Sequence, residues 1–220
     1  MQLAVVTPGQ LAYDRALALQ KALLSRRLAS GPDALVLLEH PPVYTLGRGA
    51  DARHLGGAAQ GEVPVLRVSR GGEVTYHGPG QLVGYPILAL GDLRPDVHWY
   101  LRTLEEILIA TLDDFGIRAT REAGKTGVWV AGQRKIASIG VAVRRWVTWH
   151  GFALNVGADL HGFDAITPCG IEGVKMTSVA REGGPESVVE VIPVLLRRFM
   201  RGFGYDAMIS LAPDAIAVPA

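Results

Sequence analysis

The sequence has a single cysteine, Cys169, among its 220 residues. One cysteine excludes an intrachain disulfide and every zinc site that is built on several cysteines. No stretch approaches the ~18 consecutive apolar residues that a membrane-spanning helix needs. The first residues, MQLAVVTPGQ, lack the basic start and apolar stretch of a secretory signal. We therefore expect a cytoplasmic protein that does not enter a membrane.

The sequence also lacks an excess of charge of one sign. Its 22 Lys and Arg residues face 21 Asp and Glu residues, which leaves a net charge of +1. Because nucleic-acid-binding proteins usually carry a clear cationic excess, we expect no nucleic-acid partner. Apolar residues make up 49% of the chain and charged residues 20%, which excludes a disordered chain. The length predicts one domain that spans residues 1–220.

The common nucleotide-binding motifs are incomplete. Gly124-Lys125-Thr126 is similar to the end of a phosphate-binding loop, but the earlier glycine of that motif is replaced by Ala119. Gly78-Pro79-Gly80 is followed by a glycine that comes one residue too late for a dinucleotide fingerprint. In both places the following residues predict a strand where a helix is required. We therefore expect neither nucleotide-binding fold.

Metal-binding and serine-hydrolase motifs are missing as well. The six histidines show none of the short spacings of metal ligands, and no Gly-x-Ser-x-Gly elbow is present. The histidines are His40, His54, His77, His98, His150 and His161. We therefore predict no metal centre.

Apolar periodicity predicts a mixed α+β domain. Helical spacing covers 9–29, 97–115 and 186–203, with Asp96 as an N-cap. Pro193 should kink the last helix unless it lies in the first turn. Strands are expected over 34–38 and 82–88, from 63 onward, and repeatedly between 117 and 156, with a hairpin turn at 132–133. The order of these elements does not show the regular strand–helix alternation of a doubly wound fold.

Cys169 lies in Thr167-Pro168-Cys169-Gly170-Ile171, where the flanking proline and glycine predict a tight loop. Loops of this kind often carry catalytic groups, whereas a lone cysteine in an apolar protein is more often a small buried residue. A catalytic thiol also needs a cation beside it to become a thiolate. We expect Lys135 to supply it, because small and apolar residues follow it at once.

The segment 118–145 concentrates positive charge. It holds seven Lys and Arg residues and one acidic residue, Glu122, which gives a local charge of +6. Two interpretations stay open for it: a solvated basic face, or a docking surface for an acidic partner. The segment 70–81 has two interpretations as well, because its glycines suit either a surface hairpin or a close approach to a ligand.

Four segments, in order along the chain, resemble the signature of one family. They are RGGEVTYHGPGQLVGYPI at 70–87, GKTGVWV at 124–130, RKIASIGVAVRRWVTWHGFALNV at 134–156 and ITPCGI at 166–171. The combination resembles the lipoyl(octanoyl) transferases, the octanoyl-acyl-carrier-protein:protein N-octanoyltransferases. The resemblance implies the catalytic fold shared with biotin and lipoate protein ligases, a mixed sheet packed with helices.

The resemblance also implies roles for single residues. The catalytic cysteine of the family falls on Cys169 and its lysine falls on Lys135. The substrate-binding segments fall on Arg70, Gly71, Gly72, Glu73, Val74, Thr75, Tyr76, His77, Ser138, Ile139, Gly140, Gly151, Phe152 and Ala153. As a hypothesis of our own, backbone N–H groups near Gly170 stabilise the oxyanion of acyl transfer.

The implied chemistry is transfer of an octanoyl or lipoyl group through a Cys169 thioester. The donor would be octanoyl-acyl carrier protein. The acceptors would be lysines of lipoyl domains in 2-oxoacid dehydrogenase E2 subunits and in the glycine cleavage H protein. Because thioester exchange is nearly balanced and formation of an amide from a thioester is downhill, neither ATP nor a metal is expected. We also expect a monomer.

Two other functions remain open. An ATP-dependent lipoate or biotin protein ligase could share the fold and would form an acyl-adenylate, for which Cys169 has no role. A binding module that only holds acylated carriers would have a Cys169 thiol of ordinary reactivity. A Cys169→Ala variant separates the transferase from the ligase, because the ligase would stay active.

Overall fold

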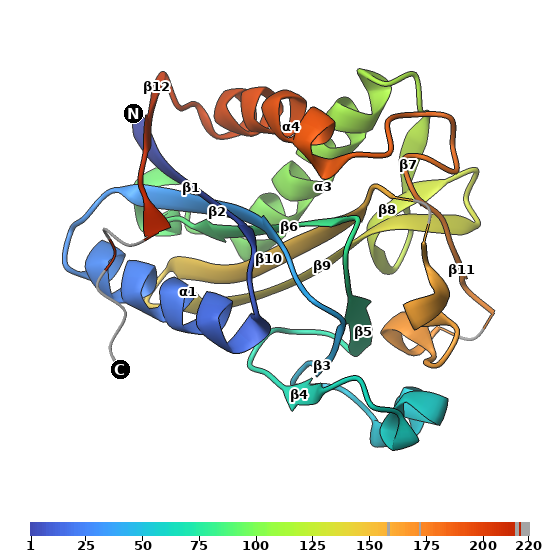
Figure 1. Ribbon diagram of the computed structural model, residues 1–220. Helices are drawn as coiled ribbons and strands as arrows, with labels where there is room; N and C mark the ends of the chain where they lie inside the picture. The colour runs from blue at the N-terminus through green and yellow to red at the C-terminus, as the bar shows by residue number, and fades with distance from the viewer. Residues whose placement is uncertain (158, 172, 214–215, 217–220) are drawn as a thin grey trace.

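The computed structural model describes residues 1–157, 159–171, 173–213 and 216. A large sheet runs through the molecule, with its strands in the order β12-β1-β2-β6-β10-β9-β8-β7 and β11 paired with β9 (Figure 1). The sheet is mixed. β1 runs parallel to its two neighbours, β2 and β12. From β2 to β7 each strand runs antiparallel to the next one in the sheet order. Its strands are β1 (Gln2–Gln10), β2 (Asp33–Glu39), β6 (Gln81–Ile87), β7 (Ala119–Glu122), β8 (Lys125–Val130), β9 (Arg134–Arg144), β10 (Val147–Asn155), β11 (Lys175–Met176) and β12 (Ala207–Ser210).

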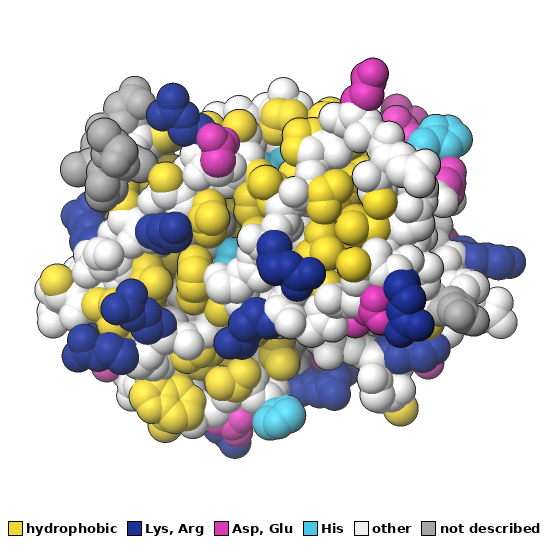
Figure 2. All heavy atoms as spheres, turned by 90° about the horizontal axis from the view of Figure 1, so that it is seen from below, with side chains coloured by type: hydrophobic (Ala, Val, Ile, Leu, Met, Phe, Trp, Pro, Cys, Tyr) yellow, Lys and Arg dark blue, Asp and Glu magenta, His cyan; other side chains and the backbone are white. Residues whose placement is uncertain are grey.

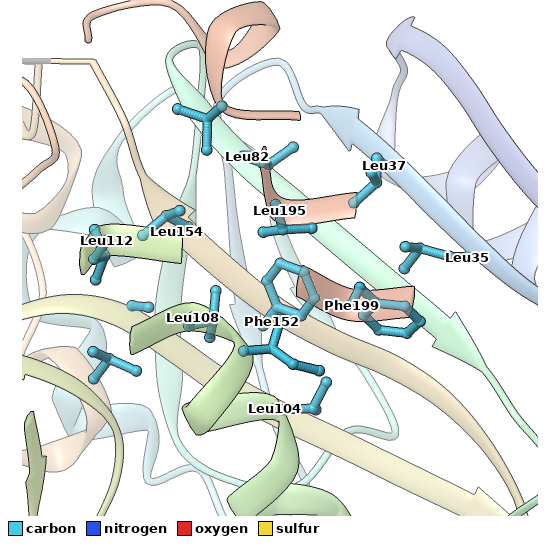
Figure 3. Close-up of a cluster of buried hydrophobic side chains, with 14 of the residues drawn as sticks. Leu35, Leu37, Leu82, Leu104, Leu108, Leu112, Phe152, Leu154, Leu195 and Phe199 are labelled. Atoms are coloured by element: carbon cyan, nitrogen blue, oxygen red, sulfur yellow. The ribbon is translucent and has the colours of Figure 1, made fainter. Parts of the chain in front are cut away.

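Two long helices cover one face of this sheet. α3 (Val97–Asp113) and α4 (Val188–Phe203) pack against each other and against the central strands (Figure 1). Figure 3 shows leucine side chains of both helices meeting Phe152 and Leu154 of β10 in a closed apolar cluster. At ~25 cal/mol for each Å² of apolar surface removed from water, this cluster is a major stabilising contribution to the fold.

The opposite face is only partly covered by a helix. α1 (Tyr13–Leu28) packs there on β2, β6 and β10, and the short α2 (Leu90–Leu93) lies near the end of β10. Beside α1 lies a second sheet of three strands, in the order β4-β3-β5 (Figure 1). Its elements and the nearby 3-10 helices are β3 (Val43–Leu46), β4 (Val65–Arg67), β5 (Val74–His77), η1 (Ala52–Gln60), η2 (His161–Phe163) and η3 (Pro168–Gly170).

The mixed α+β architecture agrees with the sequence prediction, and so do several local features. The Asp96 side chain caps α3 by accepting a hydrogen bond of 3.0 Å from the Trp99 N–H. β8 and β9 are joined by a tight turn at residues 131–133. Strands 33–39 and 81–87 lie where the apolar runs placed them, because strands buried on both faces are continuously apolar.

One expectation about local structure was wrong. Residues 2–10 form β1, so the first helix begins at Tyr13 and not at residue 9. Pro193 lies in the second turn of α4 and not in its first, and the kink expected there stays a prediction. Residues 74–77, for which a surface hairpin and a close approach to a ligand were both left open, form β5, whose side chains alternate between an apolar cluster and a polar one.

In the part of the chain that the structure describes, no helix has both the length and the apolar character needed to cross a bilayer.

Candidate active site

A cavity of about 310 Å³ lies between the large sheet, the small sheet and the N-terminal end of α1. Its volume is at the lower end of the range for small-molecule sites. Strands β5, β6, β9 and β10 form most of the wall, and the loop that carries Cys169 closes one end. The lining residues are Tyr13, Arg70, Gly72, Glu73, Val74, Thr75, His77, Val83, Tyr85, Gly124, Lys125, Thr126, Lys135, Ser138, Ile139, Gly140, His150, Gly151, Phe152, Ala153, Cys169 and Ile171.

Lys135 and Cys169 meet at the end of this cavity. The Lys135 Nζ donates a hydrogen bond of 3.0 Å to the Cys169 Sγ, although the two residues are 34 positions apart. Lys135 lies on β9 and is only 2% exposed, while Cys169 is half-buried. Among the described residues no carboxylate forms an ion pair with Lys135. An ammonium group at this distance favours the ionised thiol electrostatically.

The backbone around Cys169 has an uncommon conformation. Cys169 has φ +59° and Gly170 has φ +65°, so two consecutive residues occupy the left-handed region. For any residue that has a Cβ, this conformation is higher in free energy than the usual ones. Non-glycine residues held in it are frequent at functional sites. A Cβ on Gly170 would lie 3.0 Å from Cε1 of His54 and 3.1 Å from Cγ of Glu73. A larger residue at this position would therefore be strained in its backbone and would crowd His54 and Glu73.

The small sheet and its connections hold the Cys169 loop from outside. The Thr167 N–H donates to the His54 carbonyl at 2.8 Å. The His54 ring bonds through Nδ1 to the Glu73 carboxylate at 2.9 Å. The loop is thus fixed by groups that precede it in the chain by about a hundred residues.

Gly127 makes room for the lysine. It has φ +121°, and a Cβ there would lie 2.5 Å from the Ala137 carbonyl oxygen and 2.9 Å from Cε of Lys135. Its N–H donates to the buried Glu105 carboxylate at 3.1 Å, which ties β8 to α3. Any larger residue at 127 would push the lysine side chain out of its position.

Arg70 places a second buried cation in the cavity. It is 8% exposed, and its guanidinium donates to the carbonyl (2.6 Å) and hydroxyl (2.8 Å) of Thr45. Burial lowers the pKa of Arg70, while the charges of neighbouring Tyr13 and Cys169 raise it. The arginine stays charged at neutral pH. In the described chain Arg70 has no ion-pair partner. Arg70 and Lys135 are thus two buried cations in this cavity that form no ion pair with a carboxylate among the described residues.

Neutral histidines and tyrosines surround Arg70. Burial lowers the pKa of His77 to about 3 and the pKa values of His40 and His150 to about 4. Burial also raises the pKa of Tyr13 to about 12. His77 bonds through Nδ1 to Gln81 at 2.7 Å, and His40 bonds through Nε2 to the hydroxyl of Tyr85 at 2.7 Å. These side chains are therefore uncharged and polar near neutral pH.

Two polar atoms in the cavity wall have no hydrogen-bond partner in the described structure. They are the Thr75 Oγ1 and the His150 Nδ1, and both side chains are more than nine-tenths buried. Buried polar groups without partners are rare and point to a ligand or a water.

The structure gathers nearly all the site residues expected from the sequence in this one cavity. Arg70, Gly72–Thr75, His77, Ser138–Gly140, Gly151–Ala153, Lys135 and Cys169 all line it. Gly71 and Tyr76 do not. The Gly71 N–H pairs with the Val141 carbonyl, and the Tyr76 ring packs outward on Tyr44 and Phe163.

The expected oxyanion donors are already engaged. The Gly170 N–H donates to the Thr167 carbonyl and the Ile171 N–H donates to the Pro168 carbonyl, each at 3.1 Å. These bonds form because residues 168–170 make a 3-10 turn. These two N–H groups are thus engaged in the turn, and the hypothesis that backbone N–H groups near Gly170 stabilise an oxyanion stays a prediction. The Thr75 hydroxyl in the cavity wall has no partner in the described structure.

Several lining residues were missed by the sequence analysis. Gly124 in the β7–β8 turn and Lys125 and Thr126 at the start of β8, which had been considered only as a phosphate-binding loop, line the cavity. Tyr13, Tyr85 and His150 reach it from α1, β6 and β10. Their spacing gives no local signal, because the three elements come together only in the folded chain.

The basic segment 118–145 does not form one face. Lys135 is buried, Arg121 is paired with Glu105 and Glu106, and Arg134 is paired with Glu182. Arg144 and Arg145 lie at the β9–β10 turn, at the opposite end of β9 from Arg134. Figure 2 shows that on the face seen from below, hydrophobic side chains gather in the middle with Lys and Arg side chains between them.

The described residues contain no group of three or more His, Cys, Asp or Glu side chains placed to hold a metal ion.

A family of known sequence and two relatives are similar to most of this chain. The family described as "Lipoyl protein ligase A/B catalytic domain" matches residues 12–200. The octanoyltransferase of Gloeobacter violaceus is 54% identical over 202 residues, which cover 91% of this chain and 90% of that protein. The octanoyltransferase of Synechococcus sp. strain JA-2-3B'a(2-13) is 48% identical, over 96% of this chain and 86% of that protein.

Solved structures are similar in fold at much lower identity. The bipartite lipoate protein ligase of Thermoplasma acidophilum, from an archaeal lipoylation system, superimposes with a TM-score of 0.78 at 20% identity. The alignment covers 98% of this chain and 90% of that one. At this identity the likeness concerns the fold.

Proposed function

The chain belongs to the lipoyl protein ligase A/B catalytic-domain family and is an acyltransferase that moves octanoyl groups in protein lipoylation, and from this premise we propose that Cys169 carries the acyl group as a thioester. The observation that supports this role is the 3.0 Å contact between the Lys135 Nζ and the Cys169 Sγ in the wall of the cavity. The proposed catalytic domain is the whole chain.

In the first step the Cys169 thiolate attacks the carbonyl carbon of an octanoyl thioester on acyl carrier protein. The new carbon–sulfur bond forms to Cys169, and the bond to the carrier's sulfur breaks. The Lys135 ammonium gives its proton to the leaving thiolate. The Thr75 hydroxyl, which is buried and unpartnered, donates to the carbonyl oxygen as negative charge develops there.

In the second step the amine of a lysine on a lipoyl domain attacks the acyl-Cys169 thioester. The amide bond forms, the bond to the Cys169 sulfur breaks, and the amine's proton passes to the Lys135 amine. The product leaves, and the thiolate and ammonium pair is restored. The reaction needs neither ATP nor a metal, since a thioester supplies the activation that an acyl-adenylate would otherwise provide.

The acyl chain lies in the cavity between β9 and β10 in this proposal. Gly140 and Gly151 pair across these strands, and both line the cavity. Neither has room for a side chain, because a Cβ on Gly140 would lie 3.0 Å from Cδ of Arg70 and one on Gly151 would lie 2.1 Å from the Gly84 carbonyl oxygen. Val83, Ile139, Phe152 and Ala153 supply apolar wall. A chain of eight carbons suits this wall better than a charged group would, because burying apolar surface is favourable.

Intact-protein mass spectrometry tests the proposal directly. Octanoyl-acyl carrier protein is mixed with the wild type and with Cys169→Ala, without ATP. We expect one octanoyl adduct on the wild type only, and its discharge on addition of a lipoyl domain. Lipoyl-domain modification that needs ATP and magnesium and persists in Cys169→Ala would replace the proposal with an ATP-dependent ligase.

A further inference from the structure

Two further hollows adjoin the cavity that Cys169 lines. One, of about 240 Å³, shares Lys125 and Ile171 with this cavity. The other, of about 670 Å³, shares Ile171, Gly173, Val174 and Lys175 with the first. The hollows therefore follow one another past Ile171 to the β11 strand. We call the surface outside the cavity the arm groove and define it by Lys125, Ile171, Gly173, Val174 and Lys175.

Two exposed lysines flank the arm groove. Lys125 and Lys175 are exposed, and in the described part of the chain neither forms an ion pair with a carboxylate. The Lys125 Nζ lies 5.2 Å from the centre of the Trp129 ring, and the Lys135 Nζ lies 5.2 Å from the same ring. Lys125 is therefore a close neighbour of the catalytic pair. The nearby Arg134 is already neutralised by Glu182.

The direction of the groove matters for a thioester substrate. With the acyl part in the cavity, the group on the other side of the thioester sulfur has to leave Cys169 in another direction. The arm groove adjoins the cavity at Ile171, two residues after Cys169, and at Lys125. Its walls combine apolar atoms of Ile171 and Val174 with cations at Lys125 and Lys175. This chemistry fits a long, uncharged chain that ends in an anion.

We propose that the arm groove binds the phosphopantetheine arm of the acyl donor, with the phosphate bound between Lys125 and Lys175. The inference rests on the proposed function, because it takes an acyl thioester as the donor. The acceptor lysine has no phosphate and enters by the same mouth after the arm has left. The groove therefore acts in formation of the acyl-Cys169 intermediate rather than in its discharge.

Two small donors that differ only in the phosphate test this assignment. Octanoyl-pantetheine and octanoyl-4′-phosphopantetheine are compared by the rate of Cys169 acylation, followed by rapid-quench mass spectrometry. In the wild type we expect kcat/KM to be about tenfold higher for the phosphorylated donor, as two exposed charge contacts would give. In the Lys125→Gln/Lys175→Gln double variant we expect the two donors to react at equal rates, because the preference for the phosphorylated donor is lost.

Arg144→Gln is the matched control, since it removes one exposed positive charge at the other end of β9. It should keep the wild-type preference for phosphate. Equal acylation of the wild type by both donors would overturn the groove assignment while leaving the proposed function intact. A double variant that is slow with acyl carrier protein but keeps its preference among small donors would place the lysines on the carrier's protein surface, and would also overturn it. Absence of acylation by either donor would refute the proposed function and the groove with it.

Discussion

The two faces of the large sheet differ in the polarity of the side chains that pack on them. Under α3 and α4 the side chains are almost all apolar and fully buried, as with Leu104, Leu108 and Phe199 (Figure 3). Against the other face lies a cavity with buried polar groups around it, His150 and Lys135 from this sheet and Arg70, Thr75 and His77 from the small sheet and its connections. One strand, β10, serves both faces, with Leu154 packed in the apolar cluster and Gly151 lining the cavity.

This difference indicates which face stabilises the fold and which face carries the reaction. Apolar packing lowers the free energy of the folded state with no special geometry beyond good fit. Buried polar groups cost free energy unless they are fully bonded, and two of those in the cavity wall are not. We expect substitutions on the helix-covered face to change stability, and substitutions on the cavity face to change the reaction.

The largest effect is expected for Lys135→Met, which keeps the length of the side chain and removes its charge. Loss of the cation beside the thiol should lower the acylation rate by about 10³-fold, since it removes both thiolate stabilisation and the proton donor. The free energy of unfolding should stay the same or rise, because a buried unpaired cation costs desolvation. Single-turnover acylation and urea unfolding measure the two quantities. A stable variant that acylates at the wild-type rate would contradict the role of Lys135.

Acid should destabilise the protein through the cavity face. His40, His77 and His150 have pKa values lowered to between about 3 and about 4, against 6.5 for an unperturbed side chain. Below pH 6.5 the unfolded chain binds protons that the folded chain does not, so stability present at neutral pH is lost as the pH falls toward 4. Each histidine contributes about 1.4 kcal/mol per pH unit in this window.

Urea unfolding at pH 7, 6, 5.5 and 5 measures this loss, and His77→Gln should reduce its slope. His161→Gln serves as the control because that side chain is 85% exposed, and it should leave the slope unchanged. Equal slopes in the wild type and His77→Gln would show that His77 is not buried in its neutral form.

On the helix-covered face, Leu108→Ala should lower the free energy of unfolding by about 2–5 kcal/mol, because it leaves a cavity in a close-packed core. Leu108 is 0% exposed on α3. Acylation per folded molecule should not change. Val189→Ala is the control, since Val189 is 73% exposed on α4. Its truncation should lower the free energy of unfolding by less than about 0.5 kcal/mol, as is usual for surface sites. A Leu108→Ala variant with normal stability and slow acylation would reverse the comparison between the faces.

The smallest effect is expected for Thr75→Val, which replaces the unpartnered hydroxyl by a methyl group of similar size. If the hydroxyl donates to the developing oxyanion, kcat for acylation should fall by about tenfold or more while KM stays near the wild-type value. Thr75→Ser keeps the hydroxyl and should restore most of the rate. A Thr75→Val enzyme with full kcat would remove Thr75 from the transition state.

Much of the fold could be predicted because its signals are short in range. The apolar residues of α3 recur at helical spacing and Asp96 caps the helix three residues from its partner N–H. β1 was missed because its pairing with β2 and β12 lies outside the local pattern. The small sheet was only partly foreseen, since β5 is short and polar on the side that faces the cavity.

The sequence by itself determined the family-like motifs, the tight loop around Cys169 and the helices with strong periodicity. Each of these depends on residues that are close together along the chain. The tertiary structure alone decided that Lys135 Nζ lies 3.0 Å from Cys169 Sγ, that the basic segment is divided between two ends of β9, and that the amide of Gly170 is occupied. The physical reason is that strand pairing and loop packing, which join residues far apart in sequence, set the positions of atoms to the tenths of an ångström on which the chemistry depends.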